Sequence, residues 1–166
     1  MTMTQSLFAF MATAPGQKLE YLSVDWFGYS PMTRFYTRMN GLEYNHPLLL
    51  TTVGRKTGKH ITVVLPWFEI DGKAVICGSV GGRPTDPAWA LNLRKNPRAQ
   101  AQIYREKMTI RARLAEGPER AACWDYLVRR VPDYAIYQQR AKEHRVLPVF
   151  ILEREDGKRV VRGNGH

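Results

Sequence analysis

The sequence predicts a single α+β domain built on a small, mostly antiparallel β-barrel. The chain has 166 residues, which is the size of one domain and enough to bury a core. Six segments have the apolar runs or the alternation of β-strands, and short links join several of them as in a meander. Three or four further segments carry helix start and stop signals. This combination is typical of a barrel with flanking helices.

Residues 1–29 are predicted to form an N-terminal extension or helix of weak periodicity. Their apolar run, Leu7 to Ala12, is too short to span a membrane, and no basic residue precedes it as in a signal peptide. The run is compatible with a docking helix or with peripheral contact to a membrane surface, and both alternatives stay open. Ser30-Pro31 then predicts a helix start, because Ser caps helices and Pro suits the first helical position. This helix is expected to end at Asn40-Gly41.

The stretch from Leu48 to Asn92 carries three of the expected strands. The apolar run of residues 47–53 predicts a central strand. A strand rich in β-branched residues is expected over 60–70 and another over 73–78. Asp71-Gly72 lies between them and is a strong signal for a tight hairpin.

A helix is expected over residues 87–95, with Asp86 as its N-cap and Asn96-Pro97 as its end. Two alternating segments, 99–104 and 108–114, then predict an antiparallel hairpin with one polar face. Their link is short, which favours direct pairing of the two strands.

The last third of the chain predicts two helices and one strand. A helix is expected to open at Gly117-Pro118, to break at Val131-Pro132 and to continue from Asp133. A final strand is expected over 146–152. The charged, glycine-bearing tail of residues 154–166 is expected to be disordered.

Composition narrows the classes of partner and compartment. A formal net charge of +10 favours anionic partners, which include nucleic acids, anionic lipids and acidic small molecules. Cys77 and Cys123 have no metal or redox spacing, and the four histidines form no ligand pattern, so no metal site is expected. Two such cysteines are typical of buried thiols in a reducing compartment, which predicts a cytoplasmic protein.

The turn from Gly54 to Lys59 is the first candidate binding element. Its glycines free the backbone to present N–H groups, and Arg55, Lys56 and Lys59 add positive charge. Such a turn suits a phosphate or a carboxylate. It is not a P-loop, because the required spacing is absent and a strand follows in place of a helix. The alternative is a solvated hairpin turn without a ligand.

The loop from Ser79 to Gly82 is the second candidate. Paired glycines allow a planar or phosphorylated ligand to approach the backbone closely, although they can also serve chain reversal alone. Trp89 and Asn92, three residues apart on the following helix, share a face. A tryptophan in this position is more often part of the core than a cofactor wall.

Tyr134 and Tyr137 form the third candidate, since phenols can orient or protonate a substrate. Exposed helical tyrosines without a role are the commoner case. No Ser/His/Asp, Cys/His or paired-carboxylate arrangement is visible in the sequence. If the protein is an enzyme, the difficult chemistry therefore belongs to a bound cofactor.

These segments resemble the deazaflavin-dependent nitroreductase family. The matching runs are residues 49–58, 78–82 and 86–97, in that order, together with the pattern Pro132, Tyr134 and Tyr137. The resemblance implies a split β-barrel of the FMN-binding-like type, with six or so mostly antiparallel strands and flanking helices over residues 30–153. It also implies an enzyme that transfers a hydride from reduced coenzyme F420, a 5-deazaflavin with a phospholactate and polyglutamate tail. The acceptor would be an unsaturated, quinone-like or nitroaromatic small molecule.

The resemblance also implies a role for each matching residue. The predicted cofactor-binding residues fall into a group that holds the phosphate and acidic tail, a group that lines the deazaflavin, and a group that flanks it: Arg55, Lys56, Thr57 and Gly58; Ser79, Val80, Gly81 and Gly82; and Pro87, Trp89 and Asn92. Tyr134 and Tyr137 would be the catalytic residues of the substrate pocket.

The chain also departs from the family pattern. Val80 replaces a frequent lysine, Val131 stands where the nitroreductase has another tyrosine, and the second strand has Ile61 and Val64-Leu65-Pro66 where the family often has an Arg and a Pro-Leu pair. An FMN-binding split-barrel oxidoreductase and a non-catalytic cofactor carrier therefore remain alternatives. Specific nucleic-acid binding is disfavoured, because the basic residues are scattered over turns, helices and tail. A homodimer stays open.

Overall fold

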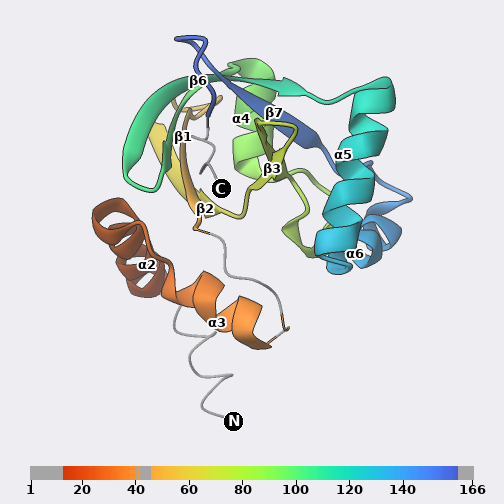
Figure 1. The fold of residues 1–166 in the computed structure, drawn as a ribbon, viewed down its shortest axis with the longest axis horizontal. Helices are drawn as coiled ribbons and strands as arrows, with labels where there is room; N and C mark the ends of the chain where they lie inside the picture. Colours follow the sequence, from red (N-terminus) through yellow and green to blue (C-terminus); the bar gives the residue numbers. More distant parts are fainter. Residues whose placement is uncertain (1–12, 40, 42–45, 161–166) are drawn as a thin grey trace.

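A curled, antiparallel sheet of seven strands forms a half-barrel in the computed structural model, which describes residues 13–39, 41 and 46–160 (Figure 1). The strand order across the sheet is β2-β1-β5-β6-β7-β4-β3, and every pair is antiparallel. The strands are Leu48–Val53 (β1), His60–Leu65 (β2), Phe68–Ile70 (β3), Lys73–Cys77 (β4), Arg98–Ile103 (β5), Glu106–Leu114 (β6) and Val149–Arg154 (β7). The predicted α+β barrel fold is confirmed.

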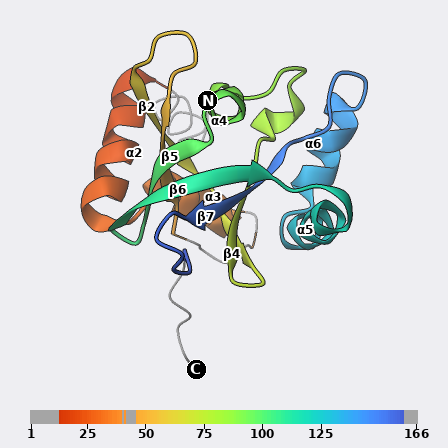
Figure 2. The same ribbon diagram turned by 90° about the horizontal axis from the view of Figure 1, so that it is seen from above.

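Helices flank the sheet on two sides, as Figures 1 and 2 show. The helical segments are Ala14–Phe27 (α2), Pro31–Met39 (α3), the short 3₁₀ turn Val80–Gly82 (η1), Ala88–Lys95 (α4), Gly117–Arg130 (α5) and Asp133–Ala141 (α6). α2 lies beside β1 and β2, whereas α5 and α6 lie together at the other end of the sheet, near β3 and β7. The apolar run of residues 7–12 lies outside the described residues. None of the helices in the described ranges is long and apolar enough to cross a membrane.

The first turn of α3 is capped from two directions. The hydroxyl Oγ of Ser30 accepts a hydrogen bond from the Thr33 amide at 2.8 Å, so the predicted N-cap is confirmed. The buried carboxylate of Glu20, which comes from α2, accepts bonds from the Ser30 hydroxyl and the Met32 amide. Because Glu20 of α2 accepts a hydrogen bond from an amide at the start of α3, this side chain links the two helices.

Two apolar cores share one wall. The first core lies inside the barrel and includes Trp89 and Leu93 of α4. The second lies between the sheet and the pair α5 and α6. Alternate residues of β4 and β7 enter different cores: Ile76 and Phe150 enter the first, and Val75 and Ile151 enter the second. Because both faces of β4 and β7 are buried, their sequences read as continuous apolar runs.

The strand predicted over residues 60–70 is in fact two strands at opposite edges of the sheet. β2 pairs with β1, whereas β3 pairs with β4. Pro66 lies at the break, where it has no N–H to donate to a ladder. Trp67 is 3% exposed, and its indole N–H donates to the carbonyl of His46 at 2.7 Å. The chain therefore leaves one edge, buries Trp67 and continues at the other edge.

Both short hairpins turn through left-handed backbone. Asp71 and Gly72 have φ of 51° and 74°, which confirms the predicted tight turn between β3 and β4. Between β5 and β6 the turn consists of Tyr104 and Arg105, with φ of 53° and 85°. Neither is glycine, so sequence signals for this turn are weak, and β6 begins at Glu106, two residues earlier than expected.

The C-terminal segment is ordered further than expected. Disorder was predicted from residue 154, but Arg154 forms ion pairs with Glu106 and Asp156. Val160 is 5% exposed and belongs to the barrel core. Residues 154–160 therefore pack on the sheet, and residues 161–166 lie outside the described residues.

Candidate functional site

The basic turn between β1 and β2 is closed by its own backbone. The Gly54 amide donates to the Lys59 carbonyl at 2.8 Å, and the Gly58 amide donates to the Gly54 carbonyl at 2.7 Å. Gly58 has a φ of 68°, and a Cβ on Gly54 would lie 2.7 Å from the Thr57 hydroxyl oxygen. Both glycines are therefore required by the shape of the turn.

Asn92 supports this turn from below. Its Oδ1 accepts a hydrogen bond from the Arg55 amide at 3.1 Å, and its Nδ2 donates to Thr52 Oγ1 at 3.0 Å. Asn92 and Thr52 are each 1% exposed. The side chain thus joins α4 to the end of β1 and to the Arg55 amide of the basic turn.

The cationic side chains of the turn are open to solvent. Arg55, Lys56 and Lys59 are exposed, and none of the three forms an ion pair within the described ranges. Thr57 is also exposed, and its hydroxyl accepts from the Lys59 amide at 3.3 Å. Three unpaired positive charges on a rigid turn form an attractive site for an anionic group.

The loop of Ser79 to Gly82 has an unusual backbone. Ser79 has a right-handed helical backbone conformation, with φ of −74° and ψ of −48°. Val80 and Gly81 have left-handed conformations, with φ of 46° and 62°. A right-handed residue followed by a left-handed one turns successive N–H groups into one concavity, which is called a nest and attracts anions. Val80 is β-branched, so its left-handed conformation is strained.

The amides of this nest are available to a ligand. The Gly82 amide donates to the Ser79 carbonyl at 2.9 Å, and the Arg83 amide donates to the Val80 carbonyl at 3.3 Å. In the part of the chain that the structure describes, the amides of Ser79, Val80 and Gly81 donate to no protein acceptor. A Cβ on Gly81 would meet nothing within 4 Å, so this side of the loop is open.

The other side of the loop rests directly on α6. A Cβ added to Gly82 would lie 2.6 Å from the carbonyl oxygen of Tyr137 and 2.8 Å from Cβ of Arg140. Only glycine permits this approach, and its φ of 79° also favours glycine. The second glycine of the pair therefore serves helix packing, whereas the first faces open space.

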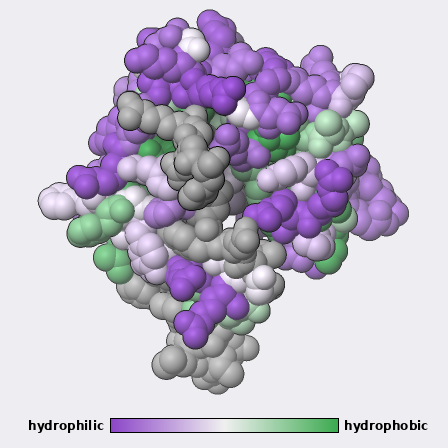
Figure 3. All heavy atoms as spheres, viewed as in Figure 1, coloured by the Kyte–Doolittle hydropathy of each residue, from purple (hydrophilic) through white to green (hydrophobic). Residues whose placement is uncertain are grey.

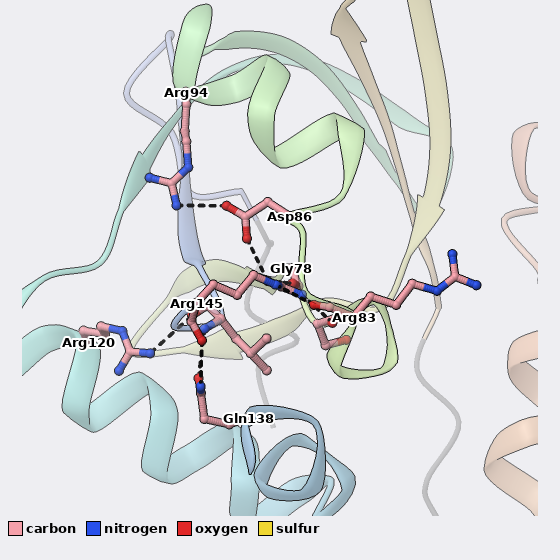
Figure 4. Close-up of polar contacts among 9 residues, drawn as sticks. Gly78, Arg83, Asp86, Arg94, Arg120, Gln138 and Arg145 are labelled. Atoms are coloured by element: carbon pink, nitrogen blue, oxygen red, sulfur yellow. Dashed lines mark hydrogen bonds and ion pairs between the residues drawn. The ribbon is translucent and has the colours of Figure 1, made fainter. Parts of the chain in front are cut away.

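Arg145 holds both ends of this loop (Figure 4). Its guanidinium donates to the carbonyls of Gly78, Ser79 and Arg83 at 2.8 to 2.9 Å, and it pairs with Asp86 at 2.7 Å. The side chains of Arg145 and Asp86 are only 9% and 12% exposed. A buried guanidinium thus satisfies three loop carbonyls and one carboxylate.

The segment that carries Arg145 is itself fixed by two helices. Gln138 of α6 donates to the Arg145 carbonyl at 3.1 Å and accepts from the Leu147 amide at 2.8 Å. Arg120 of α5 donates to the Leu147 carbonyl at 3.2 Å. Figure 4 shows Arg120, Gln138 and Arg145 converging from separate elements.

The expected role of Asp86 as the N-cap of α4 is wrong. Pro87 occupies the cap position, and no side chain caps that end. The carboxylate of Asp86 instead joins Arg145 to Arg94, which donates to it at 3.2 Å. Arg145 holds this carboxylate because a buried cation without an anionic partner is more destabilising than a helix end without a side-chain cap.

The other predicted flanking residues differ in exposure. Pro87 is half-buried, and its ring lies against Gly78. Trp89 is 6% exposed and packs against Phe150 in the barrel core, with ring centroids 5.7 Å apart. Pro87 is therefore next to the loop, whereas Trp89 supports α4 from inside.

The two tyrosines lie side by side on α6 but at different depths. Tyr134 is 4% exposed, and its ring meets Phe68 at 6.1 Å and Tyr137 at 6.3 Å. Tyr137 is half-buried, and the guanidinium of Arg140 lies 5.9 Å over its ring. Since the backbone of Tyr137 touches Gly82, Tyr137 is the tyrosine nearer to the nest.

The thiols and acids of the described residues suggest no further chemistry. Burial raises the pKa of the Cys77 thiol to about 12, and burial also raises the pKa of Cys123. Such thiols are poor nucleophiles at neutral pH. Within the described ranges, no cluster of three or more His, Cys, Asp or Glu side chains could hold a metal ion.

A cavity of about 140 Å³ lies away from both loops, between α2 and the outer face of the sheet. Most of the residues that line it are polar, and none of them is a predicted cofactor residue. The lining residues are Tyr21, Asp25, Leu49, Thr51, Thr62, Gln100, Ala101, Gln102 and Lys107. Many of these groups already satisfy one another. Thr51 and Thr62 share a bond of 2.7 Å, and Gln102 and Lys107 both bond to Asp25.

Comparison with known proteins connects this geometry to a family. A family model described as F420H(2)-dependent quinone reductase matches residues 30–154. An F420H(2)-dependent quinone reductase of Mycobacterium tuberculosis is 30% identical over 110 residues, which cover 64% of this chain and 72% of that protein.

Two solved structures are also similar. An F420-H2-dependent reductase is 38% identical, with a TM-score of 0.57 over 64% of this chain and 93% of that one. A chain described as a domain-swapped dimer is 34% identical, with a TM-score of 0.58 over 74% of this chain and 93% of that one.

Proposed function

Because the chain belongs to the F420H(2)-dependent quinone reductase family, we propose that its nest and its basic turn together hold coenzyme F420. The protein is an F420-dependent oxidoreductase of quinone-like substrates. When bound, reduced F420 supplies the hydride, and a proton completes the reduction of a quinone to a quinol. The chain's own residues have to bind the acidic cofactor, orient its ring and deliver or admit that proton.

The donor groups on the two loops fit such a cofactor. The unpaired amides of Ser79, Val80 and Gly81 suit the acceptor atoms of a planar ring that approaches the backbone closely. The unpaired charges of Arg55 and Lys56 suit the phosphate and carboxylates of the tail. FMN, which has a short tail with one phosphate, would use fewer of these charges.

We assign the predicted cofactor residues to contact and support. Contact with the tail is assigned to Arg55, Lys56, Thr57 and Gly58, and contact with the ring to Ser79, Val80, Gly81 and Pro87. Gly82, which is buried against α6, is assigned to support of the loop. Trp89 and Asn92 are assigned to support, because their side chains are buried at 6% and 1% exposure. Tyr137 is assigned the role of orienting or protonating the substrate, with Tyr134 packed behind it.

The observation that carries the proposal is that one short helix joins both loops. Asn92 of α4 accepts a hydrogen bond from the Arg55 amide of the basic turn, and Asp86, just before α4, accepts one from Arg145, which holds the nest. The two motifs, which are 20 residues apart in the sequence between Lys59 and Ser79, are thereby tied to one short helix. A ligand with a ring and an acidic tail matches this separation of a nest from a cluster of cations.

A fluorescence titration with F420 and, separately, with FMN tests the proposal. Tight binding of F420 and weak binding of FMN are expected, followed by oxidation of reduced F420 when a water-soluble naphthoquinone is added. Binding without oxidation by any quinone or nitroaromatic acceptor would indicate a carrier. Binding of FMN in preference to F420 would contradict the assignment of the basic turn.

The two tyrosines can be separated by the same assay. Tyr137→Phe is expected to slow quinone reduction while leaving F420 affinity almost unchanged, because only the hydroxyl is removed. Tyr134→Phe serves as the matched control, since its ring lies deeper in the core. A larger loss of rate in Tyr134→Phe than in Tyr137→Phe would reverse the assignment.

Two further partners belong to this proposal. A homodimer is supported by the relative described as a domain-swapped dimer, and light scattering on the purified protein measures its oligomeric state.

Peripheral membrane contact by a cytoplasmic protein is supported by Leu19, Trp26 and Phe27 of α2, which are 54%, 66% and 74% exposed. Figure 3 shows hydrophobic residues on the surface over α2. Sedimentation with anionic vesicles measures that contact, and no sedimentation would exclude it.

A further inference from the structure

The nest of Ser79, Val80 and Gly81 cannot hold its shape by itself. Val80 is a β-branched residue with φ of 46°, a conformation that costs free energy unless the surroundings impose it. Within the loop only two hydrogen bonds oppose relaxation, from Gly82 to Ser79 and from Arg83 to Val80. The second of these is long, at 3.3 Å. The strain therefore has to be balanced from outside the loop.

Arg145 provides this outside support at both ends. Its guanidinium bonds to the carbonyls of Gly78 and Ser79 on the entering side and to the Arg83 carbonyl and the Asp86 carboxylate on the leaving side. A planar guanidinium has five donors in a fixed arrangement, which allows one side chain to reach four acceptors. A lysine in its place would keep the charge but could not span the same set.

Because peptide bonds are planar, the hydrogen bonds of Arg145 to two loop carbonyls also fix the directions of the amides that follow them. In a trans peptide the C=O and the following N–H lie in one plane and point in opposite directions. Arg145 draws the carbonyls of Gly78 and Ser79 toward itself, and those carbonyls belong to the same peptide units as the amides of Ser79 and Val80. These two amides must then point away from Arg145, toward the open side of the loop.

We propose that Arg145 is a positioning residue for the cofactor: it aims the Ser79 and Val80 amides at the acceptor atoms of the deazaflavin ring. This inference rests on the proposed function and assigns a role to a residue outside both motifs. The arginine is well suited to the task because it is buried, and because Gln138 and Arg120 fix its own segment to α6 and α5. A ring that accepts from both amides would bind most tightly when their directions are already set.

The test compares Arg145→Lys with Arg94→Ala by hydrogen exchange and by F420 titration. Arg94 also pairs with Asp86, but from the exposed side and without touching a loop carbonyl, so its loss is the matched control. In Arg145→Lys the amides of Gly82 and Arg83 are expected to exchange faster by about 10-fold or more, while the amides of β7 keep their protection. The dissociation constant of F420 is expected to rise by about 10- to 100-fold, the size of one or two charge-assisted hydrogen bonds.

A chemical rescue distinguishes positioning from general stability. Arg145→Ala leaves a buried space of the shape of a guanidinium, and free guanidinium at low millimolar concentration is expected to restore part of the F420 affinity. Equal concentrations of sodium salt should restore none. If Arg145→Ala does not fold, Arg145→Lys and the exchange data decide the matter alone.

Three outcomes would overturn the inference. The first is an unchanged F420 affinity in Arg145→Lys, whether or not the loop exchanges faster. The second is an affinity loss accompanied by an equal loss of protection throughout β7, which would make Arg145 a purely structural residue. The third is absence of F420 binding by the unaltered protein, which would overturn the proposed function as well.

Discussion

Replacing Asn92 by leucine tests how the basic turn is held. Leucine branches at the same atom as asparagine but is larger, so the change opens no cavity. It removes the three hydrogen bonds of Asn92, of which the one from the Arg55 guanidinium is long at 3.5 Å, and it adds some crowding at a buried site. It leaves the Thr52 hydroxyl and the Arg55 amide without their partners. A buried polar group without a partner costs about 1–3 kcal/mol, and the Arg55 amide can recover part of this from water because the turn is exposed. The expected loss of unfolding free energy is therefore about 2–4 kcal/mol.

A double mutant separates these bonds from other effects of the substitution. Thr52→Val alone leaves the Asn92 amide group without its acceptor. In the Asn92→Leu background, Thr52→Val instead removes a hydroxyl that has already lost its donor. The double mutant should then be more stable than the sum of the two single losses by at least about 1 kcal/mol. Urea unfolding with an unchanged m-value measures each free energy.

Additive losses, or a loss below about 0.5 kcal/mol for Asn92→Leu, would refute the reasoning, because that is the ordinary range of surface substitutions. F420 affinity provides an independent check. It should fall in Asn92→Leu, since the turn that carries Arg55 and Lys56 would no longer be tied to α4. Unchanged affinity would show that the turn keeps its shape without this support.

Three further predictions concern the tail site, the helix contact and the acid stability. Lys56→Ala is expected to weaken F420 binding by about 1–3 kcal/mol, the range of a charge-assisted hydrogen bond, with Lys142→Ala as control; equal titration curves would remove Lys56 from the site. Gly82→Ala should destabilise the fold by more than about 2 kcal/mol, since its Cβ would lie 2.6 Å from a backbone oxygen, whereas Gly81→Ala, in open space, should cost about 1 kcal/mol; thermal unfolding compares them. Hydrogen bonds from Arg113 and Lys73 lower the pKa of Glu119 to about 2, so its stabilising effect is complete at neutral pH and is lost as the pH falls from its unfolded pKa toward 2. In Glu119→Gln the free energy of unfolding should depend less on pH over that range. An unchanged pH dependence would contradict the assignment.

Much of the fold could be predicted because local patterns and tertiary pairing agree. The alternation of Ala99 to Ile103 and of Met108 to Leu114 predicted the β5–β6 hairpin, and Asp71-Gly72 predicted the turn between β3 and β4. The break at Pro66 was missed. The residues on either side of it are all strand formers, and only the pairing of β2 with β1 and of β3 with β4 reveals two edges.

Only the loop residues of the candidate site have a signal in the sequence, and their contact with the cofactor stays a prediction. The glycines and cations of the two loops have local signatures, and the family and the cofactor that they implied are confirmed. Arg145 has no such signature. It follows Lys142, Glu143 and His144, a stretch that looks like solvated surface, and its burial depends on carbonyls about 60 residues earlier in the chain. The support of a loop by distant side chains is not encoded in any local pattern.

The shared wall of β4 and β7 has a consequence for how the protein melts. Because successive residues of these strands enter alternate cores, neither the barrel interior nor the layer beneath α5 and α6 can lose its packing while the other keeps it. We therefore expect a single calorimetric transition rather than two. The nest begins two residues after the end of β4, so it should lose its shape at the same temperature as the barrel and not earlier.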